Sequence, residues 1–96
     1  MKTNYYDIKI NNLMYKYSRF VDEFKGCEDD RQVFCAMYNN LIKACKEMKK
    51  ANIENPFIKV AFDEKANQEK SVMDDIIRRF TGNVWSEEEC GWVKFY

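Results

Sequence analysis

The sequence has no histidine, and it has only three glycines and one proline. Without histidine, neither a Ser-His nor a Cys-His nucleophile pair can form, and the most common general base at neutral pH is missing. The three glycines, at positions 26, 82 and 91, are too few and too widely spaced for the loop that cradles phosphates in nucleotide-binding enzymes. We therefore predict that the protein is not an enzyme and uses no cofactor.

The cysteines do not form a pattern that indicates a metal site or a disulfide framework. Cys27, Cys35, Cys45 and Cys90 lack the closely spaced ligand pairs of zinc sites, and four cysteines in 96 residues fall short of a disulfide scaffold. Free thiols in a reducing compartment are the simplest interpretation. We therefore predict a cytoplasmic protein that binds no metal.

Long apolar runs are also missing. The longest stretch without a charged residue, 32–42, has eleven residues and includes two asparagines, so it is too short and too polar to cross a bilayer. The N-terminal residues contain no apolar segment typical of a signal peptide. The sequence therefore predicts no association with a membrane.

Aromatic residues are abundant by contrast, with two Trp, six Tyr and seven Phe. We expect residues 1–96 to form a single domain, and a domain of this size cannot easily bury so many large rings. Exposed aromatic rings commonly anchor protein interfaces. Basic and acidic residues number sixteen each, which disfavours nucleic acid as a partner because its binders usually carry a basic excess.

Apolar periodicity predicts an α+β domain with the element order β-α-α-β-α-β-β. Alternation over residues 5–10 indicates a first strand, although the same apolar positions would also extend the following helix back to Asn4. That helix should begin after Asn11-Asn12. A second helix should be capped by Asp29 and Asp30 and carry a continuous apolar face.

The second half of the chain contains several boundary signals. Asn55-Pro56 precedes an alternating apolar run, Ser71 with Asp74 resembles a helix capping box, and Gly82 is placed to end a helix. The resulting prediction is a sheet of three or four strands with helices packed on one face and the other face open. The expected elements are a strand at 57–62, a loop at 63–70, a helix at 72–80 and a hairpin formed by 84–85 and 92–96.

Residues 91–95, GWVKF, resemble the second half of the RNP1 motif of RNA-recognition domains, in which aromatic rings stack bases on an open sheet. Cys90 stands where that family has a basic residue, and the family continues with a further helix and strand where this sequence ends. We treat the five-residue match as coincidental. From the alternation we retain the expectation that Trp92, Lys94 and Tyr96 face outward and that the residues between them face inward.

These outward residues and their neighbours on the other predicted strands define a candidate interface. Aromatic rings surrounded by charged groups are typical of protein–protein contacts, and the acidic run in the hairpin could engage a basic partner. The alternative is that Trp92 and Tyr96 only cover a helix edge or the loop at 63–70. The candidate interface residues are Tyr5, Tyr15, Phe57, Lys59, Glu87, Glu88, Glu89, Trp92, Lys94 and Tyr96.

We predict a small non-catalytic module that binds a larger protein or protein complex, or a second copy of itself. Compact cofactor-free chains with a similar bias toward Lys and Asn are common among phage-encoded proteins that block host machinery, including anti-CRISPR inhibitors, which suggests an inhibitor in the host cytoplasm. One alternative is single-stranded nucleic-acid binding, with Lys9, Lys59 and Lys94 on phosphates. The other is a nuclease or hydrolase that holds a divalent metal with Asp63 and Glu64.

Overall fold

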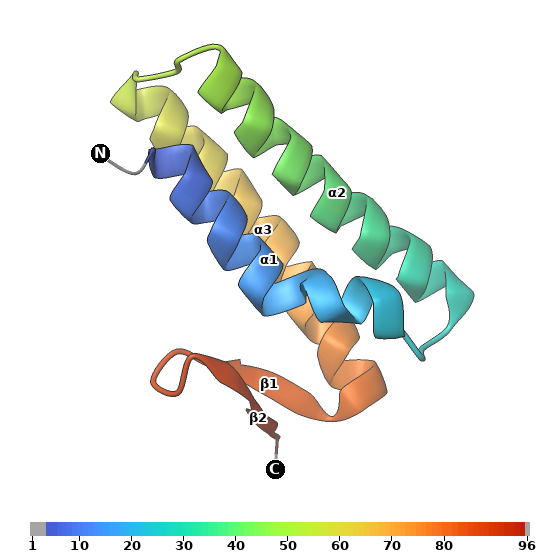
Figure 1. Ribbon diagram of the computed structural model, residues 1–96. Helices are drawn as coiled ribbons and strands as arrows, with labels where there is room; N and C mark the ends of the chain where they lie inside the picture. Colours follow the sequence, from blue (N-terminus) through green and yellow to red (C-terminus); the bar gives the residue numbers. More distant parts are fainter. Residues whose placement is uncertain (1–3, 96) are drawn as a thin grey trace.

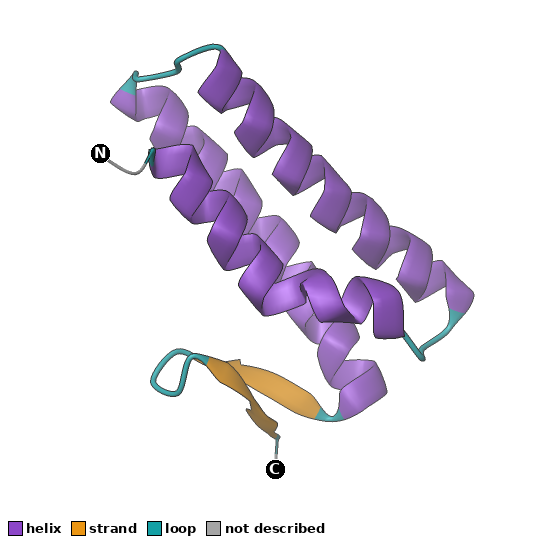
Figure 2. Ribbon diagram, viewed as in Figure 1, coloured by secondary structure: helices purple, strands orange, loops and turns teal. Residues whose placement is uncertain are grey.

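The computed structural model describes residues 4–95, which form three long helices followed by a β-hairpin (Figures 1 and 2). Successive helices run in opposite directions, and the hairpin lies across the end of the bundle at which α3 finishes (Figure 1). The elements are α1 (Tyr5–Glu23), α2 (Glu28–Lys50), α3 (Pro56–Thr81), β1 (Asn83–Ser86) and β2 (Gly91–Lys94).

The mixture of helices and sheet confirms the α+β class. The expected order β-α-α-β-α-β-β is not found, because the described residues form a sheet of two antiparallel strands. A broad sheet with helices on one face and an open opposite face is therefore not part of this structure.

The first helix begins earlier than the strand prediction allowed. The Asn4 side chain accepts a hydrogen bond of 2.8 Å from the Tyr6 backbone N–H, and this cap starts α1 at Tyr5. Tyr6 is buried and continues the apolar stripe of Leu13 toward the N-terminus. The strand at 5–10 is therefore wrong, and the alternative helix starting near Asn4 is confirmed. Asn11-Asn12 do not interrupt the helix, because both side chains lie on its exposed side.

The largest error lies in α3, where a strand and a loop were expected. Asn55 accepts a 2.9 Å hydrogen bond from the Phe57 backbone N–H, and Pro56 occupies the first helical turn, so both residues start a helix rather than release a strand. Ser71 and the run 63–70 lie inside this helix. The buried side chains of α3 begin only at Ala66, so the Asn55 cap and Pro56, together with the packed helix that follows, override the β-type alternation at 57–62.

Two other predicted helix boundaries lie close to the observed ones. Gly82 ends α3 in the left-handed conformation, with φ of 76°, and its N–H bonds the Arg78 carbonyl at 2.8 Å, as expected for such a cap. In α2, Asp29 and Asp30 lie in the first turn, where their charges complement the helix dipole. The capping position itself belongs to Cys27, which makes no side-chain capping bond.

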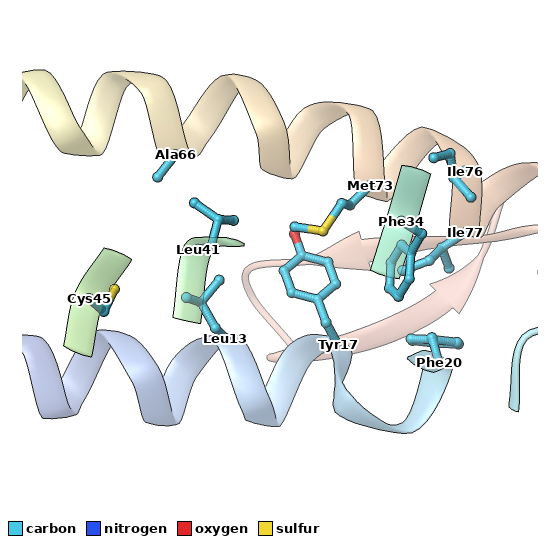
Figure 3. Close-up of a cluster of buried hydrophobic side chains, with 10 residues drawn as sticks. All are labelled: Leu13, Tyr17, Phe20, Phe34, Leu41, Cys45, Ala66, Met73, Ile76 and Ile77. Atoms are coloured by element: carbon cyan, nitrogen blue, oxygen red, sulfur yellow. The ribbon is translucent and has the colours of Figure 1, made fainter. Parts of the chain in front are cut away.

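The core follows the seam where the three helices meet (Figure 3). Each helix contributes one buried stripe, and the rings of α1 point toward side chains of both other helices. No charged side chain is fully buried among the described residues. The buried cluster consists of Leu13, Tyr17, Phe20, Phe34, Leu41, Cys45, Ala66, Met73, Ile76 and Ile77.

The hairpin closes one end of this core with its two tryptophans. Trp85 and Trp92 are directly opposite each other in the strand register, with ring centroids 5.5 Å apart. The Trp92 ring contacts Tyr17 and Phe20, and its indole N–H donates a 3.0 Å hydrogen bond to the Lys16 carbonyl. The expectation that Trp92 faces outward is therefore wrong. The alternation of side chains defines two faces of a strand but does not say which face packs against the helices. The aromatic rings at this end of the bundle favour the face that carries the tryptophans.

The expectation that Phe95 faces inward is also wrong, whereas Val93 is partly buried. Phe95 was placed on the inward side, but 57% of its surface is exposed, and the Arg78 guanidinium lies 5.7 Å from its ring centre. Lys94 is exposed as expected, and Tyr96 lies outside the described residues.

The packed position of Trp92 can be tested by alanine substitution. Trp92→Ala is expected to destabilise the fold by about 3 kcal/mol, because it removes a large ring from the core and leaves a cavity. Phe57→Ala serves as the matched control and is expected to change stability by less than about 0.5 kcal/mol, because that ring is exposed. Urea denaturation measures both, and similar small effects for the two variants would contradict the packing described.

Candidate functional site

The predicted interface residues are divided between the two ends of the bundle. Tyr5, Phe57 and Lys59 lie at the end where α1 begins and α3 begins, whereas Tyr15 and the hairpin residues lie toward the other end (Figure 1). The structure therefore does not bring them together on one face. Of the hairpin group, the three glutamates 87–89 are exposed in the turn between the strands.

The first end carries a contiguous apolar surface, which we call the α3 apolar patch and define as Phe57, Ile58, Val60 and Ala61. Phe57 is 84% exposed, Val60 56% and Ile58 46%, and Ala61 is also exposed. Residues spaced by three and four along a helix are neighbours on its surface, so Phe57 adjoins Val60 and Ala61, and Ala61 adjoins Ile58. Single exposed apolar residues are ordinary, whereas larger contiguous apolar patches are typical of interaction surfaces.

Polar contacts hold the flank of this patch in place. Lys59 pairs with Glu54 at 3.2 Å, and its ammonium lies 4.8 Å from the ring centre of Tyr5. The Tyr5 hydroxyl donates a 2.8 Å hydrogen bond to Asp63, which also pairs with Lys9. Tyr5 and Lys59, both predicted to bind a partner, thus fasten α1 to α3 beside the patch.

The Asp63 contacts change its ionisation. Burial by itself raises the pKa of the Asp63 carboxyl, but the hydrogen bonds from Lys9 and Tyr5 outweigh that effect and lower the pKa below its usual value. The same carboxylate raises the pKa of Lys9 against the opposing effect of burial. Because Asp63 is committed to these two partners, it is poorly placed to hold a divalent metal with Glu64. Within residues 4–95, no three His, Cys, Asp or Glu side chains converge on a possible metal position.

The second feature is a cavity of about 620 Å³ between α1, α3 and the hairpin, which we call the α1–α3 groove. Tyr15 and Glu87, both predicted interface residues, line it from α1 and the hairpin turn. Tyr15 is 72% exposed; its hydroxyl bonds the Cys90 carbonyl at 3.0 Å, and its ring meets Trp85 edge to face. The hairpin thereby closes one end of the groove.

Charged side chains from both helices meet in the groove. Asp74 accepts hydrogen bonds of 2.7 Å from the Tyr17 hydroxyl and 3.1 Å from the Lys16 ammonium. Burial and then the bond to this carboxylate raise the pKa of the Tyr17 hydroxyl far above its usual value. Lys70 extends from α3 into the same region, and burial together with Lys9 and Lys16 lowers the pKa of its ammonium.

Lys70, Asp74 and Trp85, which line the groove, are not among the residues that the sequence predicts for a site. A usable signal was present, because Asp63, Lys70 and Asp74 are spaced by seven and four residues and therefore share one face of a continuous helix. The spacing has this meaning only if 63–70 is helical, and the prediction of a loop there hid it. Nothing in the sequence indicated that the hairpin would fold back to close a groove between helices far apart in the chain.

Comparison of the chain with known protein families, with curated proteins and with solved structures gives no match. Across the part of the chain that the structure describes, no helix combines the length and the apolar character needed to cross a membrane.

The Tyr17–Asp74 bond predicts how stability depends on alkaline pH. The folded-state pKa of Tyr17 is raised above its unfolded value near 10, so its contribution is present below about pH 10 and is lost as the pH rises further. Tyr17→Phe removes this titration and is expected to make the free energy of unfolding fall less steeply above about pH 10. Urea denaturation at a series of pH values measures the slope, and equal slopes for the two proteins would contradict the prediction.

Proposed function

We propose that this protein is a non-catalytic module that binds a partner protein through the α3 apolar patch. The proposal is supported chiefly by Phe57, an aromatic ring with 84% of its surface exposed at the start of a well-capped helix. Interfaces take most of their binding energy from a few aromatic or large apolar anchors that become buried on association. Full burial of one such side chain contributes about 1.5–3 kcal/mol.

The helix start that presents Phe57 is already ordered, which favours binding. The Asn55 cap and Pro56 fix the first turn of α3, and the contacts of Lys59 with Glu54 and Tyr5 hold its flank. A partner would therefore meet a rigid surface, and little conformational entropy would be lost on association. The charged groups beside the patch supply the polar rim that surrounds the apolar centre of typical interfaces.

A protein is a better partner for this patch than a nucleic acid. Lys59, which lies between Ile58 and Val60 in the sequence, is paired with Glu54, and Glu64 follows one turn after Val60. Phosphate binding draws its affinity from cations that are free to replace counterions. Base stacking would need Phe57, Trp92 and Tyr96 on one open sheet face. Phe57 lies on a helix, however, and Trp92 packs against the core.

An inhibitor of host machinery is one form that such binding would take. That more specific role is supported by composition alone, through the similarity to phage-encoded inhibitors. Association of two copies through the same patch would be the homodimeric form of the proposal, and it is distinguished by measuring the mass of the protein in solution.

The patch can be tested by photo-crosslinking in cells that express the protein. A benzophenone amino acid at position 57 is expected to trap one specific partner, because that side chain would lie in the buried centre of the contact. The same probe at Val33, which is exposed on α2, is the matched control and should not trap it.

Purified partner then allows affinity to be measured. Phe57→Ser is expected to weaken binding by at least about tenfold, as for a hot-spot residue, while Val33→Ser leaves it unchanged. Raising the salt concentration should weaken the complex only slightly, since an apolar contact releases few counterions. Identical crosslinking at both positions, or full affinity in Phe57→Ser, would remove the patch as the binding surface.

A further inference from the structure

We propose that the α1–α3 groove is a binding site for a small hydroxylated anion, such as a sugar that carries one phosphate or carboxylate, with Lys70 as the group that holds the anion. This site is separate from the α3 apolar patch, and neither proposal depends on the other. Its volume of about 620 Å³ lies within the range of small-molecule sites in proteins.

The key observation is that Lys70 brings a cation that the surrounding structure does not neutralise. Its side chain is partly buried between α1 and α3, and among the described residues it has no ion pair within 4.0 Å. The two nearby carboxylates are already engaged, Asp63 by Lys9 and Asp74 by Lys16. A partly buried ammonium without a partner is unfavourable, and an anion bound from solution would relieve it.

The electrostatic surroundings of Lys70 agree with this placement. Burial is the largest effect that lowers the pKa of its ammonium, followed by repulsion from Lys9 and from Lys16, and the attraction of Asp63 is weaker than either. Among the residues that the structure describes, Asp63 and Asp74, the carboxylates of α3 on this side, form their ion pairs with Lys9 and Lys16 and not with Lys70. Lys16 and Lys70 both line the groove, and since Lys16 is paired with Asp74, Lys70 is the group that a phosphate or carboxylate would pair with.

The remaining lining of the groove explains why the ligand should carry hydroxyl groups. Asn12 from α1 and Asn67 and Ser71 from α3 offer amide and hydroxyl groups that donate and accept hydrogen bonds. Glu87 lies on the hairpin side, where it would repel a second anionic group but accept a hydrogen bond from a hydroxyl. Trp85 supplies one aromatic wall.

The anionic group is therefore expected near Lys70 and the hydroxylated part near the hairpin. Lys70 also borders a smaller cavity of about 60 Å³ together with Lys9 and Cys45, so its side chain lines both spaces. This arrangement orients the ligand, with its anionic group toward Lys70 and its hydroxyl groups toward the hairpin. It also limits the ligand to one strongly charged end.

The site can be tested by calorimetric titration with glucose 6-phosphate, glucuronate, inorganic phosphate and glucose. Glucose 6-phosphate or glucuronate is expected to bind saturably, and glucose should bind at least about tenfold more weakly because it lacks the charge-assisted contact. In ¹⁵N NMR spectra, the indole N–H resonance of Trp85 should shift on binding. The spectrum of a Trp85→Phe variant identifies that resonance.

Lys70→Met is the decisive variant, and Lys46→Met, on the exposed side of α2, is its control. Lys70→Met should weaken binding of the anionic sugar by at least about tenfold, whereas Lys46→Met should bind like the wild type. Lys70→Met should also have a higher melting temperature without ligand, because it removes the unpaired charge. Asn67→Ala, at an exposed position, tests the groove separately and should also weaken binding.

Several results would overturn the proposal. They are the absence of saturable binding by all four probes, equal affinity for glucose and glucose 6-phosphate, and unchanged affinity in Lys70→Met. Binding of inorganic phosphate as tightly as glucose 6-phosphate would remove the role of the hydroxyl-binding wall. None of these results bears on the binding of a partner protein at Phe57.

Discussion

Tyr17 is the residue through which all parts of this small fold are connected. Its ring is completely buried and lies 6.0 Å from the ring of Phe34 on α2 and 6.3 Å from Trp92 on the hairpin. Its hydroxyl bonds Asp74 on α3 at 2.7 Å. A buried hydroxyl must find a partner, so the position of α3 relative to α1 is tied to this one bond as well as to apolar packing. The hairpin in turn depends on the aromatic surface that Tyr17 and Phe20 provide.

This arrangement explains why the groove exists beside the core. Asp74 is drawn toward Tyr17 and Lys16, and Asp63 toward Lys9 and Tyr5, so α1 and α3 face each other through long polar side chains. Such side chains span the distance between helices without filling it as apolar side chains would. The cavity that remains is polar, and the hairpin closes it at one end.

The two ends of the bundle therefore differ in chemistry. At the start of α3, apolar side chains project into solvent from a rigid helical turn, a surface suited to a partner protein. Toward the hairpin, ammonium, carboxylate and amide groups line a groove that is open to solvent, a setting suited to a small polar ligand. Both surfaces are built on α3.

The sequence alone determined the α+β class, the course of α2, the left-handed end of α3 at Gly82 and the closing hairpin. Each of these depends on local chemistry, such as an unbroken apolar stripe or a glycine placed where φ must be positive. It also identified Phe57 and Tyr15 as exposed aromatic residues, although for Phe57 it assigned the wrong secondary structure.

Only the tertiary structure decided whether residues 5–10 and 57–62 would be helix or strand, and which face of the hairpin would turn inward. Short apolar runs fit either secondary structure, and the choice depends on contacts with residues distant in the chain. Trp92 is partly buried because Tyr17 and Phe20 lie beneath it, and Lys70 shares cavity linings with Lys9 and Lys16 because α1 and α3 lie side by side. Local periodicity carries no information about such neighbours, since they are set by the packing of whole elements.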